Sequence, residues 1–183
     1  MRKAILITFL SLFLIGNAQK MMIDNTVVDK LDLERYLGTW YEIARYDHKF
    51  ERGLVGVSAH YSLRSDGKIK VLNSGYKGSL DGKYSEAIGK AKIPNPEEPG
   101  KLKVSFFLFF YGDYYVMELD DDYQWAVIGS SSDKYLWILS RQAIMDDHIY
   151  DDLLNRLRAR SYDTSLLIKV KQDANASSKP NAR

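Results

Sequence analysis

The sequence predicts an all-β protein, an eight-stranded up-and-down antiparallel barrel with one C-terminal α-helix packed outside it. Eight segments with strand character follow one another at close spacing, and short turns link each to the next. After Arg141 the hydrophobic period changes from that of a strand to that of a helix. An up-and-down order of strands closes into a barrel with room for one small ligand.

The strands are defined by alternating side chains and by the turns between them. Residues 31–37 precede them as a short helical turn, which Asp32 can cap. Ser65-Asp66-Gly67-Lys68 predicts a hairpin turn, and the proline-rich segment 94–100 ends the fourth strand. The eight strands are expected at residues 39–46, 57–63, 69–76, 84–93, 102–110, 114–119, 125–129 and 136–140.

The last part of the chain predicts a helix and one further strand. Ile149, Leu153, Leu154 and Leu157 recur on one face of a helix, which Asp146 or Asp147 can cap. We expect this helix to lie against the outside of the barrel. Residues 166–170 can then pair as a final strand, and residues 173–183 form a disordered tail.

The first 18 residues have the pattern of a secretory signal peptide. A basic start, Arg2-Lys3, precedes an apolar run at residues 4–15 and the small residues Gly16 and Ala18, after which we expect cleavage. The alternative is a membrane anchor, but the run is shorter than the ~20 residues that a spanning helix needs. A lead-in at residues 19–31 and one domain at residues 32–172 follow.

Composition narrows the function classes. The 183 residues include no cysteine, which excludes disulfides and a thioether-linked lipid anchor, so we expect a soluble periplasmic or secreted protein. There are 26 basic and 24 acidic residues, and cleavage removes two of the basic ones. The resulting balance gives no electrostatic reason to expect nucleic acid or an anionic membrane as partner.

Three motifs carry a resemblance to a known family. Gly38-x-Trp40 opens the first strand, Asp122-Tyr123 lies at a turn between two strands, and Arg141 follows the last barrel strand. In this order and spacing they resemble the lipocalin family, and within it the bacterial lipocalins and apolipoprotein-D-like proteins. The resemblance implies that Trp40 fills the closed end of the barrel and that Arg141 packs over it. Both residues are therefore expected to stabilise the fold rather than to contact a ligand.

Side chains alternate between the two faces of a strand, and Trp40 is taken to point inward. With the other strands aligned as in the family, this alternation predicts which side chains face the interior of the barrel, called here the cup. Small inward residues leave volume and large ones shape it, although a barrel of this size can also fill itself with side chains. The predicted ligand-binding residues are Glu42, Ala44, Ala59, Tyr61, Val71, Asn73, Ala87, Val104, Phe106, Tyr135 and Trp137.

Polar residues interrupt the apolar lining. Glu42 and Asn73 either contact a lipid head group or form hydrogen bonds with other side chains of the barrel. Glu118 is a third candidate for this polar lining, but a register shift of one residue would turn its side chain outward. Residues 47–55 are expected to cover the mouth. Four basic residues lie in or near this loop: Arg45, His48, Lys49 and Arg52. Each could contact an anionic head group, but for each we favour the interpretation that it is an ordinary charged side chain exposed to solvent.

The expected function is to bind, carry or store small hydrophobic ligands, foremost fatty acids or lysophospholipids, in the bacterial cell envelope. The protein is expected to be a monomer or a weak homodimer without a cofactor, metal or catalytic residue. The three histidines lack metal-ligand spacing, and Gly56-Val57-Ser58-Ala59-His60 lacks the second glycine of a nucleophile elbow.

Two other functions remain open at this point. The barrel can be a closed interaction module that binds another protein through the mouth loops at residues 47–55 and 109–115. It can also carry a pigment or haem, but no histidine is expected to face inward.

Overall fold

The structure, a computed structural model, describes residues 22–176. The expected signal peptide, residues 1–18, and the end of the expected tail, residues 177–183, lie outside the described part. Two helices, α1 (Leu33–Tyr36) and α2 (Asp147–Ala159), and a 3₁₀ turn at Thr164–Leu166 accompany the strands. The strands are β1 (Gly38–Tyr46), β2 (Leu54–Leu63), β3 (Ile69–Lys77), β4 (Tyr84–Lys92), β5 (Lys101–Phe107), β6 (Phe110–Leu119), β7 (Trp125–Gly129), β8 (Trp137–Ser140) and β9 (Leu167–Lys169).

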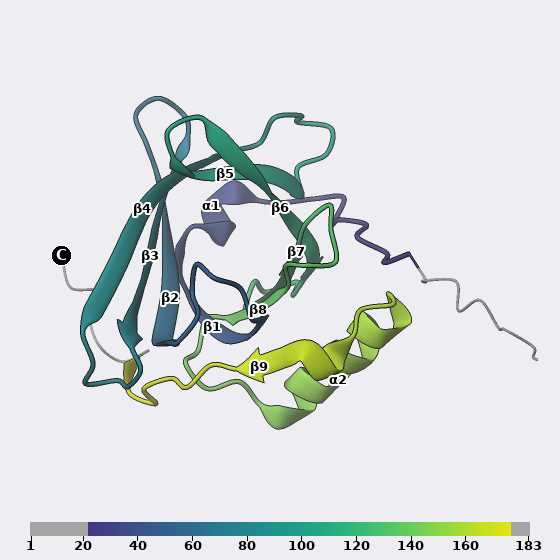
Figure 1. Cartoon of the computed structure of the whole chain (residues 1–183). Helices are drawn as coiled ribbons and strands as arrows, with labels where there is room; N and C mark the ends of the chain where they lie inside the picture. Colours follow the sequence, from purple (N-terminus) through teal and green to yellow (C-terminus); the bar gives the residue numbers. More distant parts are fainter. Residues whose placement is uncertain (1–21, 177–183) are drawn as a thin grey trace, which may run out of the picture.

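The first eight strands close into a barrel (Figure 1). Each strand from β2 to β7 pairs antiparallel with its successor, β8 pairs with β1, and β1 pairs back with β2. The strand β9 adds to β1 as a ninth member of the sheet. The predicted fold class, an eight-stranded antiparallel barrel with one helix after it, is confirmed.

The turn between β5 and β6 differs from the prediction. The strands expected at residues 102–110 and 114–119 placed it at residues 111–113. In the structure Phe107 pairs with Phe110 across a two-residue turn, in which Leu108 has a φ of 47°. Gly112 instead lies within β6, opposite Val104. The segment at residues 110–115 is therefore strand rather than mouth loop.

The helix α2 covers one outer side of the barrel, as Figure 1 shows. Its residues Tyr150, Leu153 and Leu157 are buried against Val127 and Ile138 of the barrel wall. The side chain of Asp146 accepts a hydrogen bond from the amide of His148 and so caps the helix. Within residues 22–176, no helix has both the length and the apolar character needed to span a membrane.

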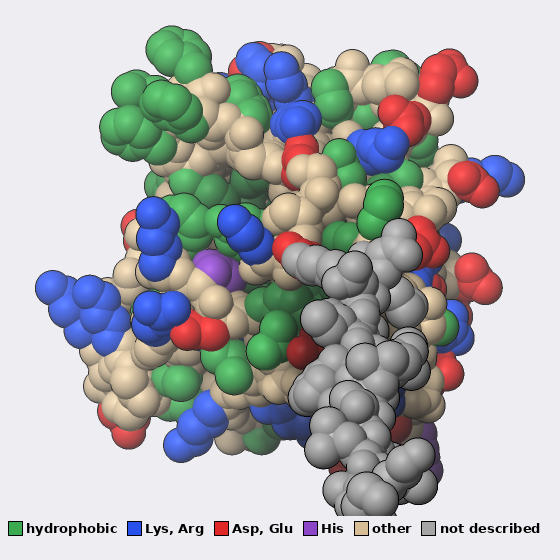
Figure 2. Space-filling model, turned by 45° about the vertical axis from the view of Figure 1, so that its right-hand side comes forward, with side chains coloured by type: hydrophobic (Ala, Val, Ile, Leu, Met, Phe, Trp, Pro, Cys, Tyr) green, Lys and Arg blue, Asp and Glu red, His purple; other side chains and the backbone are tan. Residues whose placement is uncertain are grey.

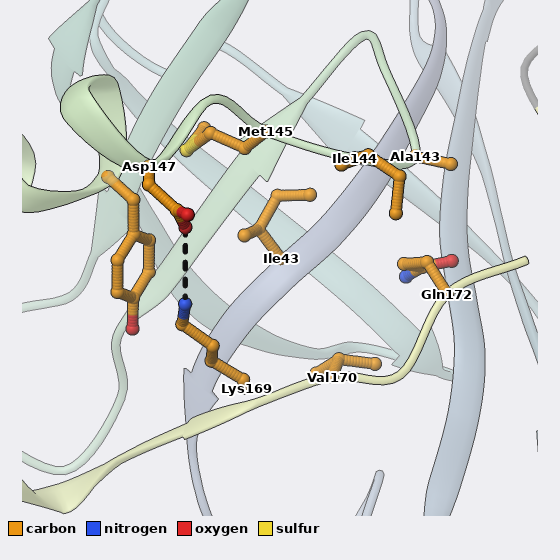
Figure 3. A pocket seen from close by; sticks show the side chains of 9 residues that line it. Ile43, Ala143, Ile144, Met145, Asp147, Lys169, Val170 and Gln172 are labelled. Atoms are coloured by element: carbon orange, nitrogen blue, oxygen red, sulfur yellow. Dashed lines mark ion pairs between the residues drawn. The ribbon is translucent and has the colours of Figure 1, made fainter. Parts of the chain in front are cut away.

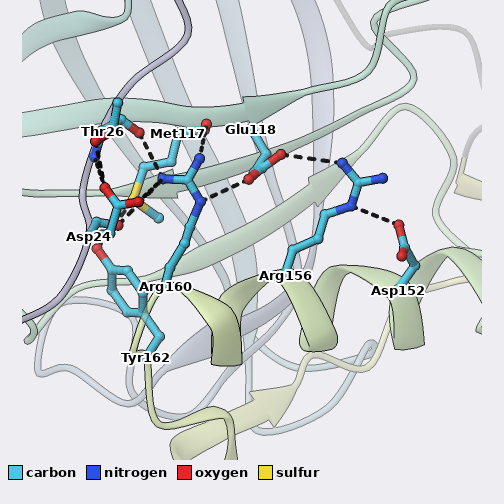
Figure 4. Close-up of polar contacts among 8 residues, drawn as sticks. All are labelled: Asp24, Thr26, Met117, Glu118, Asp152, Arg156, Arg160 and Tyr162. Carbon is cyan, nitrogen blue, oxygen red and sulfur yellow. Dashed lines mark hydrogen bonds and ion pairs between the residues drawn. The ribbon is translucent and has the colours of Figure 1, made fainter. Parts of the chain in front are cut away.

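Glu118 lies on this outer side and does not face the cup. Its carboxylate accepts a hydrogen bond of 2.8 Å from Nε of Arg160, and Nη1 of Arg156 lies 3.5 Å away (Figure 4). Arg160 also donates to the carbonyl oxygens of Thr26 and Met117. The network ties the segment before α1 and the end of α2 to strand β6.

The closed end of the barrel is built by the three sequence motifs. The guanidinium carbon of Arg141 lies 3.8 Å from the ring centre of the fully buried Trp40. Arg141 donates hydrogen bonds to the carbonyl oxygens of Thr39, Arg35 and Tyr123. Gly38 has a φ of 91°, and a Cβ there would approach Nη1 of Arg141 to 3.3 Å, so both conformation and space favour glycine.

The turn motif contributes to the same closure. The hydroxyl of Tyr123 accepts a hydrogen bond of 2.8 Å from the amide of Asp32, and the guanidinium of Arg35 stacks over its ring. Asp122 is exposed and lies 3.9 Å from Arg35. The indole nitrogen of Trp40 donates to the carbonyl oxygen of Tyr36, the last residue of α1. Helix α1 is thereby fixed across the floor of the cup.

Candidate ligand-binding cup

The wall of the cup is formed by inward residues that follow one another across neighbouring strands. Trp40 pairs with Ala59, Ala59 with Asn73, and Asn73 with Ala87. A second row joins Tyr61 of β2 to Val71 of β3. Tyr61 and Val71 are buried, whereas Ala59, Asn73 and Ala87 keep accessible surface. The cup is therefore packed near its floor and open higher up.

The other strands complete the lining. Val104 pairs with Ala91 and packs against the barrel core, and Phe106 approaches Gly89 so closely that a Cβ there would lie 2.8 Å from its ring. Tyr135 and Trp137 stack with ring centres 5.9 Å apart. Phe106 is partly exposed, and Tyr135 and Trp137 are half-buried. The structure therefore places Val104 against the packed floor, and Phe106, Tyr135 and Trp137 in the open half of the cup.

One predicted lining residue, Ala44, is placed wrongly by sequence alternation. Strand β1 has a bulge: Glu42 pairs with Leu139 and Ala44 with the adjacent Ile138, which leaves Ile43 as an extra residue. Ala44 consequently packs with the cluster beneath α2, outside the cup. Beyond the bulge Arg45 pairs with Trp137 and takes the inward position.

A buried cluster of charged residues lies at the mouth. Arg45, 2% exposed, donates from Nη1 to the carboxylate of Glu42 at 2.5 Å and from Nη2 to the carbonyl oxygen of Glu51 at 2.7 Å. Glu51 accepts a hydrogen bond of 3.0 Å from the indole nitrogen of Trp137. His48 Nε2 lies 3.0 Å from the same carboxylate. The expected solvated charge is therefore wrong for Arg45 and His48, which hold the loop between β1 and β2 over the mouth.

The other two basic residues of this loop behave as solvated charge. Lys49 is exposed, and Arg52, also exposed, pairs with Asp47 at 2.8 Å. Burial distinguishes Arg45 and His48 from these two exposed neighbours.

The surroundings of the two carboxylates in the mouth cluster shift their pKa values in opposite directions. Burial, reinforced by the nearby Glu51 carboxylate, raises the pKa of Glu42 well above its ordinary value. Burial opposes the charge of Glu51 as well, but contacts from His48 and Trp137 outweigh it and lower the pKa of Glu51. Glu42 therefore takes up a proton more readily than Glu51 does.

Among the buried polar atoms without a hydrogen-bond partner within the described residues, two belong to side chains at inward positions of the barrel. They are Nε of Arg45 and Oδ1 of Asn73, and both are buried. Buried polar atoms are ordinarily hydrogen-bonded. The cup thus presents one donor and one acceptor to a molecule that enters it.

Three tyrosines near the floor form a feature that sequence reasoning missed in part. The hydroxyls of Tyr36 and Tyr114 lie 2.6 Å apart, and Tyr61 donates to Tyr114 at 2.9 Å. Burial raises the pKa of all three hydroxyls, so they stay neutral at physiological pH. Only Tyr61 was predicted to face inward. Tyr114 follows the misplaced turn, and Tyr36 belongs to α1, so strand alternation gave no signal for either.

A groove outside the barrel contains none of the cup residues. It has a volume of about 180 Å³ and lies between β1, the start of α2 and the segment around β9 (Figure 3). Ile43, Ile144 and Val170 give it apolar walls, and Lys169 lies 3.7 Å from Asp147 across it. We regard it as a seam between helix and barrel, distinct from the cup.

Comparison with known proteins agrees with this architecture. A family model for the lipocalin-like domain matches residues 31–172. The outer membrane lipoprotein Blc of Vibrio cholerae is 47% identical over 146 residues, which cover 79% of this chain and 85% of the relative. Blc of Escherichia coli K12 is 46% identical over 80% of this chain and 82% of its own. Apolipoprotein D of Macaca fascicularis is 32% identical, with 80% of each chain covered.

Solved structures support the fold. Insecticyanin from the tobacco hornworm Manduca sexta superposes with a TM-score of 0.65 at 22% identity, over 84% of this chain and 87% of that one. The cockroach allergen Per a 4 gives a TM-score of 0.64 at 20% identity, over 85% and 97%. Taken with the family match and the bacterial relatives, the barrel and its closing motifs show that this chain belongs to the lipocalin family, whose members are binding and transport proteins rather than enzymes.

Proposed function

We propose that this lipocalin binds a single-chain acyl lipid, a fatty acid or a lysophospholipid, and carries it in the bacterial cell envelope. Membership of the family supports binding of a small hydrophobic ligand. The outer membrane lipoproteins among its relatives imply an exported protein. The acyl chain would lie between Ala59, Ala87 and Val104, and the polar head would lie at the mouth.

The observation that carries this proposal is the buried guanidinium of Arg45. Its two terminal nitrogens are used by Glu42 and by the loop, whereas Nε has no partner within the described residues. A carboxylate or phosphate oxygen of a lipid is a strong acceptor for such a donor, more so where water is scarce. The raised pKa of Glu42 favours the same outcome, because a carboxyl group that takes up a proton more readily repels an anionic head group less.

The magnitudes suit a lipid with modest head-group contact. Burial of a 16-carbon chain at ~0.8 kcal/mol per methylene contributes roughly 12 kcal/mol. Association costs at least ~4 kcal/mol, which leaves about −8 kcal/mol, or micromolar affinity. The acyl chain supplies most of this binding free energy. We therefore expect the protein to accept many kinds of acyl chain and to distinguish lipids mainly by their head groups.

The head-group role of Arg45 is tested with the substitution Arg45→Gln. We expect the affinity for oleic acid to fall about tenfold, as one charge-assisted hydrogen bond is lost, and the affinity for oleyl alcohol to change little. Calorimetric or fluorescence titration with both lipids measures this. Arg52→Gln, in the same loop but exposed and paired with Asp47, is the matched control and should leave both affinities unchanged. Equal losses for acid and alcohol would show that Arg45 only holds the loop, and the proposed head-group contact would be wrong.

A further inference from the structure

The hairpin between β5 and β6 carries four exposed hydrophobic residues in a row, Phe107–Phe110, called here the hairpin tip. Phe109 is 85% exposed, Phe110 76% and Phe107 66%. The strand order places the hairpin tip at the same end of the barrel as the mouth, where β1 ends and β2 begins. Figure 2 shows hydrophobic side chains that protrude as a group from one corner of the molecule, with lysine and arginine side chains on the same face. Exposed groups of large apolar side chains mark interaction sites.

The backbone of the hairpin tip is prepared for an apolar environment. The hydroxyl of the buried Ser105 lies 3.4 Å from the carbonyl oxygens of both Phe107 and Leu108 and can donate to either. Phe107 and Phe110 pair across the turn, and their rings stack with centres 6.3 Å apart. Unpaired backbone groups are costly in hydrocarbon, so this pairing lowers the cost of inserting the turn into lipid.

Two lysines stand at the base of the hairpin tip. Nζ of Lys90 lies 6.0 Å from the ring centre of Phe109, and Nζ of Lys92 lies 4.9 Å from that of Tyr111. Neither lysine has an ion-pair partner within residues 22–176. Other basic residues near the hairpin are neutralised locally, since Arg64 pairs with Asp66 and Lys103 with Asp113. Lys90 and Lys92 therefore provide positive charge just behind the apolar end.

We propose that the hairpin tip docks the protein on the surface of a lipid bilayer that contains anionic lipids. The aromatic and leucine side chains would enter the acyl boundary, and Lys90 and Lys92 would contact the phosphates one layer above. This arrangement of apolar tip and cationic base complements a bilayer interface, in which hydrocarbon lies beneath negative phosphate. Docking would bring the mouth of the cup to the membrane. The inference goes beyond ligand binding by the cup and does not require it.

The test is vesicle binding by the full-length protein, measured by flotation with phosphatidylcholine vesicles that contain or lack phosphatidylglycerol. The double substitution Phe109→Ser/Phe110→Ser should lower the partition coefficient at least about tenfold on both kinds of vesicle. The control Ile144→Ser/Ile168→Ser removes two exposed apolar side chains on the helix side and should bind as the unaltered protein does.

The lysines are tested separately. Lys90→Gln/Lys92→Gln should weaken binding about tenfold or more to vesicles with phosphatidylglycerol, and hardly at all to phosphatidylcholine alone. Oleic acid affinity of the hairpin variants should stay unchanged, which separates this proposal from the function of the cup. An unaltered protein that binds neither kind of vesicle, or serine variants that bind as well as it does, would overturn the proposal and direct attention to a protein partner for the hairpin tip.

Discussion

Replacing Trp40 with alanine is expected to lower the free energy of unfolding by about 3–5 kcal/mol, the largest stability effect of any single substitution considered. The indole is fully buried in the core cluster of the floor. Its removal leaves a cavity, takes away the hydrogen bond to Tyr36 and deprives the guanidinium of Arg141 of the ring on which it stacks. The hydrogen bonds of Arg141 to Thr39, Arg35 and Tyr123 would remain, but without the ring that positions the guanidinium.

Urea denaturation followed by far-ultraviolet circular dichroism measures this effect without relying on tryptophan fluorescence. Trp125→Ala is the matched control, since this indole is half-buried on the outer wall and should cost about 1–2 kcal/mol. If Trp40→Ala were as stable as the unaltered protein but bound no lipid, Trp40 would be a ligand contact and its structural role would be wrong.

Filling the cup is expected to have the largest effect on binding. Ala87 lies in the inward row with Asn73, and its side chain keeps accessible surface, so Ala87→Trp adds an indole to open space. If the indole displaces about four methylenes of an acyl chain, roughly 3 kcal/mol is lost, which corresponds to about a hundredfold weaker binding. Titration with oleic acid measures the loss, and thermal unfolding shows that the barrel persists.

The adjacent residue provides the control. Ile88 follows Ala87 in β4 and points to the outer face, where it is exposed. Ile88→Trp should leave oleic acid affinity within about twofold of the original, because the added ring lies outside the cup. Unchanged affinity in Ala87→Trp would contradict the assignment of the ligand to this part of the barrel.

The features that could be predicted from the sequence depend on local patterns. Alternation with period two located the strands, and turn residues such as Asp66 and Gly67 marked most of their ends. Trp40 and Arg141 could be matched because their roles depend on fixed positions at the ends of strands. The helix α2 was evident from the spacing of Leu153 and Leu157 and from its capping aspartate.

The features that could not be predicted depend on single-residue irregularities and on contacts distant in sequence. The bulge at Ile43 reverses the faces of β1, which turns Ala44 outward and Arg45 inward, and no local pattern announces it. The turn at Leu108 and Phe109 contains neither glycine nor proline, so the glycine at 112 was a misleading signal. The mouth cluster joins Arg45 to Glu51 and Trp137, a contact that only the closed barrel creates.

The central claim, that the cup carries an acyl lipid, is tested most directly by native mass spectrometry with lipid extraction on the protein purified from a bacterial cell envelope. We expect the unaltered protein to retain a mass increment that extraction identifies as a fatty acid or lysophospholipid, and Ala87→Trp to be bare. An unaltered protein that is also bare, and that takes up no fluorescent fatty acid when one is offered, would contradict the claim.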